Sequence, residues 1–435
     1  MPYRVLIISP HFPPVNAADH QRVRMSLPYF QKFGWKPTVL TVAPHFVNGV
    51  YDPLLQKTVP KETEIISTPA LPTQLTQCFG LGTLGWRALP YLAKAGNQLL
   101  AARPFDLIYF STTAFPTLSL AAPWYKKFRI PYVIDFQDPW LSDYHKRTDT
   151  PPPGGRLKYG LNQFFARIQE PKALRHVSQI ISVSPKYPQV LCDRYPWLKP
   201  QQCSELPFGA PQSDFDLLPL LSVKQQIFDP QDGFRHWVYV GRGGTDMSVA
   251  LRLLFAGIQQ LRQQSGELRK PTKLHFIGTS YAPADRAVET IRPIAEEFNL
   301  ADIVEERTQR IPYFEAIKAL TDSDAILLIG SDDPSYTASK LYPCILAKKP
   351  ILAIFHQQSS VVSILQQCKA GQAVTFDGPD YSADTLSSMA TKIKWLQSLP
   401  QRSTPKTNWP AFEPYTAREM TRKQCEIFDR CIAKT

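Results

Sequence analysis

A polar turn rich in hydroxyl groups lies between two apolar segments in the second half of the chain. It covers residues 332–342 and includes Ser339 and Lys340. The apolar segment before it, 325–330, is typical of a buried strand, and another apolar strand follows from Ile351. The pattern predicts a βαβ unit whose turn lies at the carboxyl end of a strand, where open α/β sheets bind ligands. Free N–H groups at the helix start and the Lys340 ammonium suit an anion such as a diphosphate. The alternative is an ordinary turn with a solvated lysine.

A similar turn opens the chain. An apolar strand at 3–8 is followed by a polar, proline-containing turn at 9–19, a predicted helix at 21–33 and a second strand at 36–42. This is another βαβ opening, but it lacks the GxGxxG fingerprint. A dinucleotide is therefore not predicted, and no other cofactor is expected.

A glycine-rich turn follows the apolar segment 237–240. Gly241, Gly243 and Gly244 let the backbone approach a phosphate, and Arg242 can make a bidentate contact with it. The alternative is a glycine-rich turn with a surface arginine. Fixed cations and N–H groups can hold a diphosphate without a metal ion, so no metal is predicted.

Strands and helices alternate along both halves, which predicts parallel, doubly wound α/β sheets. First-half strands are expected at 3–8, 36–42, 64–67, 107–110, 132–134 and 180–183. Second-half strands are expected at 237–240, 273–277, 303–305, 325–329, 351–354 and 373–375. Helices are expected at 21–33, 249–264, 284–298, 314–320, 384–396 and 416–432. Because 435 residues are too many for one core, we expect two domains, with a boundary between 203 and 228.

The composition is that of a globular protein, with 43% hydrophobic and 20% charged residues. No apolar run reaches the roughly 18 residues needed to span a bilayer. The N-terminal apolar run is too short for a signal peptide, so the protein is expected to stay in the cytoplasm. The seven cysteines form no CxxC motif, which favours free buried thiols over disulfides or zinc.

The net charge of +12 and the pI of about 9.2 favour anionic partners. No nucleic-acid motif is present, so nucleic acid is not expected as a partner. Basic residues alternate with aromatic residues and leucines at 79–103 and 124–129. This pattern is compatible with attachment to an anionic membrane surface, on the inner face of the plasma membrane. The alternative is a core helix with basic residues on its solvated side.

Seven short motifs follow one another along the chain. They are Phe12-Pro13-Pro14 with Asn16-Ala17-Ala18 and Arg22, Asp135-x-x-Asp138-x-Trp140, Ser182-Val183-Ser184, Pro207-x-Gly209, Gly241-Arg242, Ser339-Lys340-Leu341-Tyr342 and Lys349-Pro350-Ile351. In this order they resemble the retaining GT-B glycosyltransferases of family 4, which make bacterial polysaccharides and glycolipids. The resemblance spans nearly the whole chain.

The resemblance implies a GT-B fold, in which two Rossmann-like domains face each other across a cleft. It implies an acceptor-binding domain at 1–210, a nucleotide-sugar-binding domain at 211–410 and, at 411–435, a C-terminal helix that crosses back to the first domain. The implied reaction moves a sugar from a nucleotide diphosphate to a cell-envelope polysaccharide or lipid-linked acceptor, with retention. The leaving phosphate can take the acceptor's proton in such a reaction, so no separate base is required.

The resemblance also implies roles for single residues. The catalytic set is Arg242, Lys340 and Asp138. The donor-binding set is Asn16, Gly241, Gly243, Gly244, Gly278, Thr279, Arg310, Ile311, Ser335, Tyr336, Ser339 and Leu341. The acceptor-binding set is Phe12, Asp19, Arg22, Thr112, Thr113 and Trp140. Asp135 and Asp138 could instead cap a helix or brace a loop, and His11 is expected to be structural.

The chain departs from the family pattern in its second domain. Met247 stands where a lysine is usual, and Ser335 and Pro343 stand where the family carries a Glu-x7-Glu pair. Two other function classes therefore stay open. One is a sugar-nucleotide hydrolase or epimerase of the same fold, and the other is a non-catalytic sugar-nucleotide-binding protein.

Overall fold

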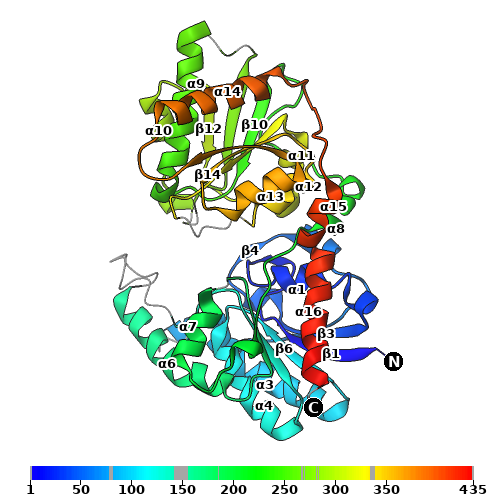
Figure 1. Cartoon of the computed structure of the whole chain (residues 1–435). Helices are drawn as coiled ribbons and strands as arrows, with labels where there is room; N and C mark the ends of the chain where they lie inside the picture. The colour runs from blue at the N-terminus through cyan, green and yellow to red at the C-terminus, as the bar shows by residue number, and fades with distance from the viewer. Residues whose placement is uncertain are drawn as a thin grey trace. The chain divides into compact units, whose positions relative to one another are not determined.

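The structure is a computed structural model. It describes residues 2–77, 82–141, 155–184, 186–265, 268, 270–280, 282, 284–333 and 339–433. The chain divides into two compact units: unit 1 is Met1–Gly209 with Ala417–Thr435, and unit 2 is Ala210–Thr416 (Figure 1). The predicted site residues Ser335 and Tyr336 lie outside the described residues, as do Cys78 and residues 79–81 of the basic and aromatic segment.

Unit 1 is built on a parallel sheet, as the alternation of strands and helices predicted. Among the described residues it has seven strands in the order β5 (Glu64–Thr68), β3 (Trp35–Val42), β1 (Tyr3–Ile8), β6 (Leu107–Ser111), β7 (Tyr132–Phe136), β8 (Gln179–Ser182) and β9 (Cys203–Glu205). The order reverses direction between β1 and β6, which pair in register from Val5 with Leu107 to Ile8 with Phe110. Ligands of open α/β sheets bind beside such a switch point.

Helices cover both faces of this sheet because strand side chains alternate between the two faces. One face, with Leu6, Ile8, Ile108 and Phe110, packs against α3 (Leu84–Ala102), α4 (Ala121–Phe128), α6 (Arg156–Leu174) and α7 (Lys186–Arg194). The other face packs against α1 (Gln21–Ser26), the 3-10 helix η1 (Phe30–Phe33) and α16 (Ala417–Ile432). The smaller elements of the unit include α2 (Thr73–Gln77) and the antiparallel pair β2 (Val15–Asn16) and β4 (Val50–Tyr51).

Two predicted helices are shorter than expected, and a proline explains each case. The helix predicted at 21–33 is divided into α1 and η1, because Pro28 has no backbone N–H to continue the helical ladder. The helix predicted at 284–298 is reduced to a 3-10 turn, η8 (Ala284–Arg286), and α10 (Arg292–Glu297). Pro293 lies in the first turn of α10, the position where proline is tolerated.

Unit 2 repeats the scheme with its own parallel sheet. Within the described part of the chain the sheet has six strands in the order β12 (Val304–Arg307), β11 (Thr272–Ile277), β10 (Arg235–Val240), β13 (Ala325–Ile329), β14 (Ile351–His356) and β15 (Gly371–Phe376). Its switch point lies between β10 and β13, where Trp237 pairs with Ala325. The turns after β10 and β13 are the two turns that the sequence singled out.

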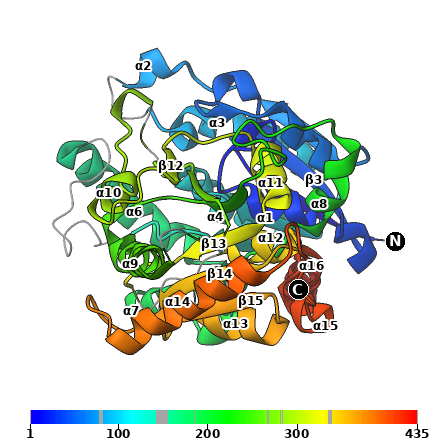
Figure 2. The ribbon, with the colours of Figure 1, turned by 90° about the horizontal axis from the view of Figure 1, so that it is seen from above.

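The helices of unit 2 also divide between the two faces (Figure 2). One face packs against α9 (Ser248–Ser265), α10 and α14 (Ala383–Ser398), and the other against α11 (Tyr313–Asp322), α12 (Leu341–Leu346) and α13 (Ser360–Cys368). Gly257 lets α9 approach α14, because a Cβ there would lie 2.6 Å from Met389 Cγ. Two short helices, α8 (Gln212–Leu217) and α15 (Trp409–Phe412), lie near the ends of the unit in sequence.

The C-terminal helix α16 belongs to unit 1. Its Phe428 ring stacks on Phe30 with ring centroids 6.2 Å apart and meets Trp35 edge-on at 5.3 Å, both typical of aromatic pairs. Trp35 Nε1 donates a hydrogen bond to Asp429 Oδ1 at 2.9 Å. Aromatic packing and this hydrogen bond therefore join the last helix to the first strands of the chain.

Candidate functional site

Lys340 lies at the switch point of unit 2, at the N-terminal end of α12. Its Nζ is 5.9 Å from the centre of the Tyr239 ring, and it forms no hydrogen bond or ion pair with any residue that the structure describes. Burial lowers the pKa of Lys340 to about 8, and the positive charges of Arg242 and Arg310 act in the same direction. A largely buried cation among like charges is an environment that an anionic ligand would stabilise.

The glycine turn after β10 makes room for this lysine. A Cβ on Gly241 would lie 2.5 Å from Lys340 Nζ and 2.6 Å from Tyr239 Oη. Two backbone hydrogen bonds connect this turn to the end of β11 and the turn that follows it. Gly241 N donates to Ile277 O at 2.9 Å, and Gly243 N donates to Thr279 O at 2.7 Å. The backbone after β10 and the side chain of Lys340 thus meet at one point of the sheet edge.

Arg242 lies at the same edge but is held by a carboxylate. Its two terminal nitrogens donate to Asp246 Oδ1 at 2.8 Å and Oδ2 at 2.6 Å. These hydrogen bonds lower the pKa of Asp246. Contact between Arg242 and a phosphate would have to share or replace this ion pair, a constraint that the sequence did not indicate.

The other predicted donor residues fall around the same edge. Gly278 has a φ of +73° and passes close to the backbone of Arg310, with 3.8 Å between a Cβ built at Gly278 and Arg310 Cα. The hydroxyl of Thr279 donates to Glu306 Oε1 at 2.6 Å. Ser339 is exposed, whereas the Leu341 side chain is buried in the core, so Leu341 could offer a ligand only its backbone.

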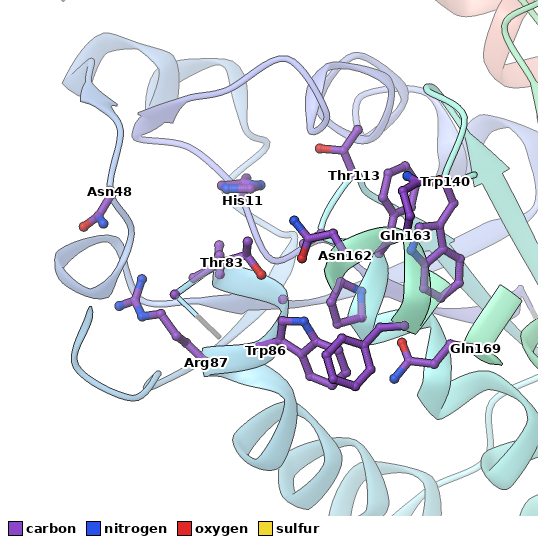
Figure 3. A pocket seen from close by; sticks show the side chains of 17 residues that line it. His11, Asn48, Thr83, Trp86, Arg87, Thr113, Trp140, Asn162, Gln163 and Gln169 are labelled. Atoms are coloured by element: carbon purple, nitrogen blue, oxygen red, sulfur yellow. The ribbon is translucent and has the colours of Figure 1, made fainter. Parts of the chain in front are cut away.

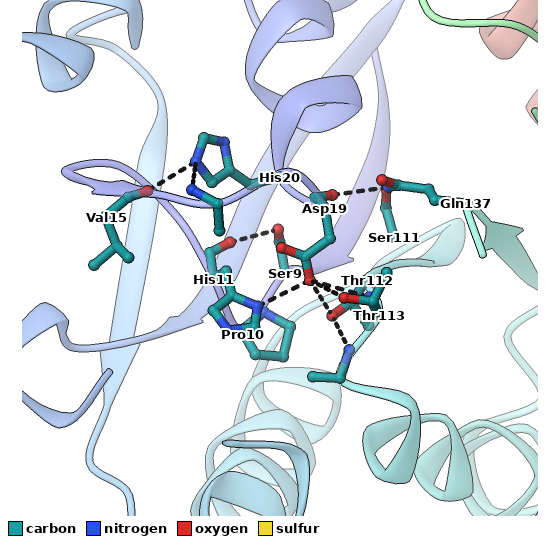
Figure 4. Close-up of polar contacts among 12 residues, drawn as sticks. Ser9, Pro10, His11, Val15, Asp19, His20, Ser111, Thr112, Thr113 and Gln137 are labelled. Carbon is teal, nitrogen blue, oxygen red and sulfur yellow. Dashed lines mark hydrogen bonds and ion pairs between the residues drawn. The ribbon is translucent and has the colours of Figure 1, made fainter. Parts of the chain in front are cut away.

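In unit 1, Asp19 is a buried junction between two turns (Figure 4). Its Oδ2 accepts hydrogen bonds from His11 Nδ1 at 2.9 Å, Thr112 Oγ1 at 3.0 Å and the Thr113 backbone N–H at 3.0 Å. Burial alone would raise the pKa of Asp19, but the hydrogen bond and charge of His11, with smaller effects of the Thr113 N–H and of His20, lower it to about 2. Asp19 is therefore an anion that orients His11 and joins the turns after β1 and β6.

Asp135 and Arg22 form a second buried junction. Arg22 Nε donates to Asp135 Oδ2 at 2.8 Å, and both side chains have no exposed surface. Arg22 also donates to Leu206 O at 2.6 Å, and Asp135 accepts from Ser111 Oγ at 2.8 Å. The resemblance implied an acceptor contact for Arg22 and for Phe12, but the structure encloses both side chains, because Arg22 neutralises Asp135 and Phe12 packs in the core.

Asp138 and Asn16 remain accessible at this edge. The Asp138 side chain reaches solvent, yet surrounding protein atoms and the negative charge of Asp19 raise its pKa. Asn16 is half-buried in the short pair of β2 with β4. The roles predicted for these two residues stay predictions.

A pocket of about 420 Å³ lies at the same edge of unit 1 (Figure 3). Two predicted acceptor residues, Thr113 and Trp140, line it together with His11. The rest of the lining comes from Asn48, the chain just before and at the start of α3, the turn after β6 and one side of α6, which the sequence had not joined to the site. A signal was present in α6, where Asn162, Phe165 and Gln169 recur at helical spacing.

Most of the basic and aromatic segment 79–103 forms α3, which packs in the core of unit 1 and does not present its leucines to a membrane. Leu84, Leu92 and Leu100 of α3 are buried in the core, and Trp86 lines the pocket. Arg87 is buried and donates to backbone carbonyls. The core-helix alternative therefore fits the leucines of α3, although its Arg87 is buried and not on a solvated side. No helix within the described residues is both long and apolar enough to cross a bilayer, and these residues contain no cluster of three or more potential metal ligands.

Comparison with known proteins supports the fold. No family model and no curated sequence matches the chain. A glycosyltransferase from Rickettsia africae aligns over 100% of both chains with 12% identity and a TM-score of 0.56. A sucrose-phosphate synthase from Thermosynechococcus elongatus aligns over 100% of both with 13% identity and a TM-score of 0.58. The Anabaena protein HepE, solved with UDP and glucose, aligns over 98% of both with 14% identity and a TM-score of 0.54.

At these identities the likeness concerns the fold alone. The chain has the two-sheet α/β architecture of GT-B glycosyltransferases, which confirms the predicted fold class. Because one fold supports many reactions, function has to be argued from the site.

Proposed function

We propose that this protein is a glycosyltransferase that moves a sugar from a nucleotide diphosphate donor to a saccharide or lipid-linked acceptor of the cell envelope. The observation that carries the proposal is Lys340, a largely buried cation at the switch point of unit 2, next to a turn that needs glycine. This is a suitable place for a diphosphate. The neighbour HepE, solved with UDP and glucose, has the same fold.

In the proposed reaction, the bond between the sugar C1 and the diphosphate breaks while the acceptor oxygen bonds to C1. Lys340 and the N–H groups of the neighbouring turns stabilise the charge that develops on the diphosphate. The leaving phosphate takes the acceptor's proton, which is consistent with retention and with membership of family 4. No resident metal is required for these steps.

A radiolabelled-donor screen tests the proposal. The full chain is incubated with common sugar nucleotides and with a lipid and polysaccharide extract, and the products are analysed for transfer, hydrolysis and epimerisation. Transfer with retained configuration at C1 is the expected result. Absence of transfer for every donor would contradict the proposal.

A non-catalytic binding protein is the second candidate, because Pro343, where the family carries a carboxylate, lies inside α12 and offers no functional group. Calorimetry separates the two candidates. Tight binding of a sugar nucleotide without turnover in the presence of the extract would favour the binding protein.

We also propose that unit 1 attaches to anionic lipid through its basic residues. The residues that support this proposal lie at the end of α4, where Lys126, Lys127 and Arg129 are exposed. Lys126 and Arg129 lie close enough to His176 to help burial lower its pKa, as does Arg175, so the positive charges are clustered. This basic cluster, Lys126, Lys127, Arg129 and Arg175, is the proposed contact with the membrane surface.

A further inference from the structure

A groove of about 710 Å³ lies at the open edge of the sheet in unit 2. Among the described residues, β15 is the last strand of this sheet and pairs with β14 alone, while α13 and α14 both pack against it (Figure 2). The start of β15, these two helices and the segment 403–406 line the groove, which we call the β15 groove. An edge strand presents unpaired N–H and C=O groups that can pair with an extended segment of another chain.

A hydrogen bond at the end of β15 shows which of its backbone groups point outwards. Gln357 N, just after β14, donates to Phe376 O at 2.8 Å, so this carbonyl points towards β14. Because the backbone groups of successive strand residues point to alternate sides, those of Gly371, Ala373 and Thr375 point away from β14. No described residue forms a hydrogen bond with these outward groups, and the three residues are half-buried. The outer edge of β15 is therefore free to pair.

The lining of the β15 groove is positively charged. Lys369 follows α13, Lys392 belongs to α14 and Lys406 lies in the segment after α14, so three separate parts of the chain bring an ammonium group to one groove. None of the three lysines forms an ion pair or side-chain hydrogen bond with another described residue, and no acidic residue belongs to the lining. Charge complementarity therefore favours an anionic partner.

Apart from the lysines, the lining combines apolar side chains with two polar atoms that lack a partner. Val362 and Leu365 of α13 and Trp395 of α14 supply apolar surface. Gln372 Oε1 and Ser403 Oγ are enclosed and form no hydrogen bond with the described residues. Buried polar atoms in native proteins are nearly always paired with protein, water or ligand. The groove thus offers apolar contacts and polar partners as well as positive charge.

We propose that the β15 groove binds an extended acidic segment of a partner protein, which adds to the sheet as a strand beside β15. The backbone of the segment pairs with the outward groups of Ala373 and Thr375, its acidic side chains contact the three lysines, and apolar side chains between them pack on Trp395. A second copy of this chain is a poorer occupant because it would bring the same lysines to the edge. A small anion would leave the outward backbone groups of the strand unpaired.

This surface is separate from the proposed donor site of the same unit. Pro350 and Gly371, at the amino ends of β14 and β15, line the groove, whereas the donor turns follow the carboxyl ends of β10 and β13. At about 3.3 Å per residue, a strand of the length of β14 separates the two ends by about 20 Å. The proposal therefore does not depend on sugar transfer, and Lys340→Ala should bind the acidic segment like the wild type.

Fluorescence anisotropy with labelled eight-residue peptides tests the proposal on the full chain. Glutamate alternates with valine in the first peptide, and glutamine or lysine replaces glutamate in two others. Two further acidic peptides carry N-methyl groups on the odd or on the even backbone nitrogens, which blocks pairing along one edge. The acidic peptide should bind at least tenfold more tightly than the glutamine and lysine peptides, and one of the two methylated peptides should lose binding.

Three results would overturn the proposal. The first is that the acidic peptide does not bind, and the second is that both methylated peptides bind as tightly as their parent, which would exclude strand addition. The third is that inorganic pyrophosphate displaces the labelled peptide at the same concentration as unlabelled peptide does. That result would assign the groove to a small anion.

Variants and hydrogen exchange locate the bound peptide. Replacing the three groove lysines together by glutamine should weaken binding of the acidic peptide about tenfold, the scale of several exposed ion pairs. The charge-matched control replaces the exposed Lys224, Lys394 and Lys423 by glutamine and should keep wild-type affinity. Equal losses in the two triple variants would contradict the assignment to this groove.

Ala373→Pro removes one outward N–H, a change that edge strands tolerate because the lost donor faces solvent. It should weaken binding of the acidic peptide at least tenfold while the melting curve stays cooperative. Hydrogen–deuterium exchange checks the same contact in the wild type, where saturating acidic peptide should slow exchange of the amides of Ala373 and Thr375. Unchanged exchange throughout residues 371–376 would place the peptide elsewhere, whatever the variant does to folding.

Discussion

The surroundings of Lys340 change the pKa of its side chain. A lysine in water keeps its proton up to about pH 10.4, whereas burial beside Arg242 and Arg310 lowers the pKa of Lys340 to about 8. An anion held at Nζ would restore the stability of the charged form. The same residue would then bind the donor and neutralise the leaving group.

Replacing Lys340 by alanine tests this role. A hydrogen bond to a charged group contributes about 1.5–3 kcal/mol, so Lys340→Ala should weaken UDP binding about 10- to 100-fold. Isothermal titration calorimetry measures the change. Lys394→Ala, at an exposed position on α14, is the control and should bind like the wild type.

The pH dependence of UDP binding is a second test of Lys340. Because Lys340 loses its proton as the pH rises through about 8, UDP affinity should fall above that pH in the wild type. The fall attributable to this group should vanish in Lys340→Ala. An unchanged affinity and pH profile in the variant would remove Lys340 from the donor site.

At the scale of elements, the turn after β10 requires glycine at position 241 because the Lys340 side chain lies against this position. A methyl group at position 241 would lie 2.5 Å from Lys340 Nζ, so Gly241→Ala should displace the lysine and weaken UDP binding about as much as Lys340→Ala. Gly378→Ala is the matched control, since a Cβ there meets nothing within 4 Å. Wild-type affinity in Gly241→Ala would mean that the lysine can bind from another position.

The neighbouring strands β10 and β11 contain a buried histidine pair. His236 Nδ1 and His275 Nε2 are 2.9 Å apart, and the Phe228 ring stacks against both imidazoles. Burial lowers the pKa of His275 to about 3, and the His236 ring adds to the effect. His275 therefore stays neutral in the folded protein at pH values where it is protonated in the unfolded chain.

This difference makes the stability of unit 2 sensitive to acid. Between about pH 6.5 and 3 the unfolded state binds the extra proton, so the free energy of unfolding should fall by about 1.4 kcal/mol per pH unit for this group. From pH 7 to pH 5 the wild type should lose about 2 kcal/mol more than His275→Gln. Urea unfolding measures the loss, with His45→Gln at an exposed position as control. Equal losses in wild type and His275→Gln would refute the assignment.

At the scale of the whole molecule, the net charge of +12 supports the proposal of membrane attachment. Each basic residue near an anionic surface contributes about 1 kcal/mol, so replacing Lys126, Lys127 and Arg129 together by glutamine should reduce binding about 100-fold. Sedimentation with anionic and neutral vesicles measures it. The charge-matched control replaces the exposed Lys224, Lys394 and Lys406 of unit 2 by glutamine.

Only the first triple variant should lose binding, and wild-type binding should weaken in high salt because exposed charges are screened. Equal binding to neutral and anionic vesicles would contradict the proposal, as would equal losses in both triple variants. The second outcome would mean that net charge matters and the basic cluster does not.

The amino-acid sequence by itself determined the two parallel sheets, because short apolar runs that alternate with helical segments depend on local order along the chain. It also located the turns after β10 and β13, because the end of each apolar run marks the carboxyl end of the predicted strand. Prolines 28 and 293 marked the places where the helix prediction was too long, a local signal that outweighs helical periodicity.

Tertiary structure alone decided what individual polar residues do. Arg22 looked available to a ligand, yet Asp135 and two carbonyls from residues 206 and 207 enclose it. His11 was expected to be structural, and only the structure shows that its ring contacts Asp19 and lines a pocket. That pocket joins residues from 11 to 169, and such contacts depend on packing between distant segments, which no local pattern encodes.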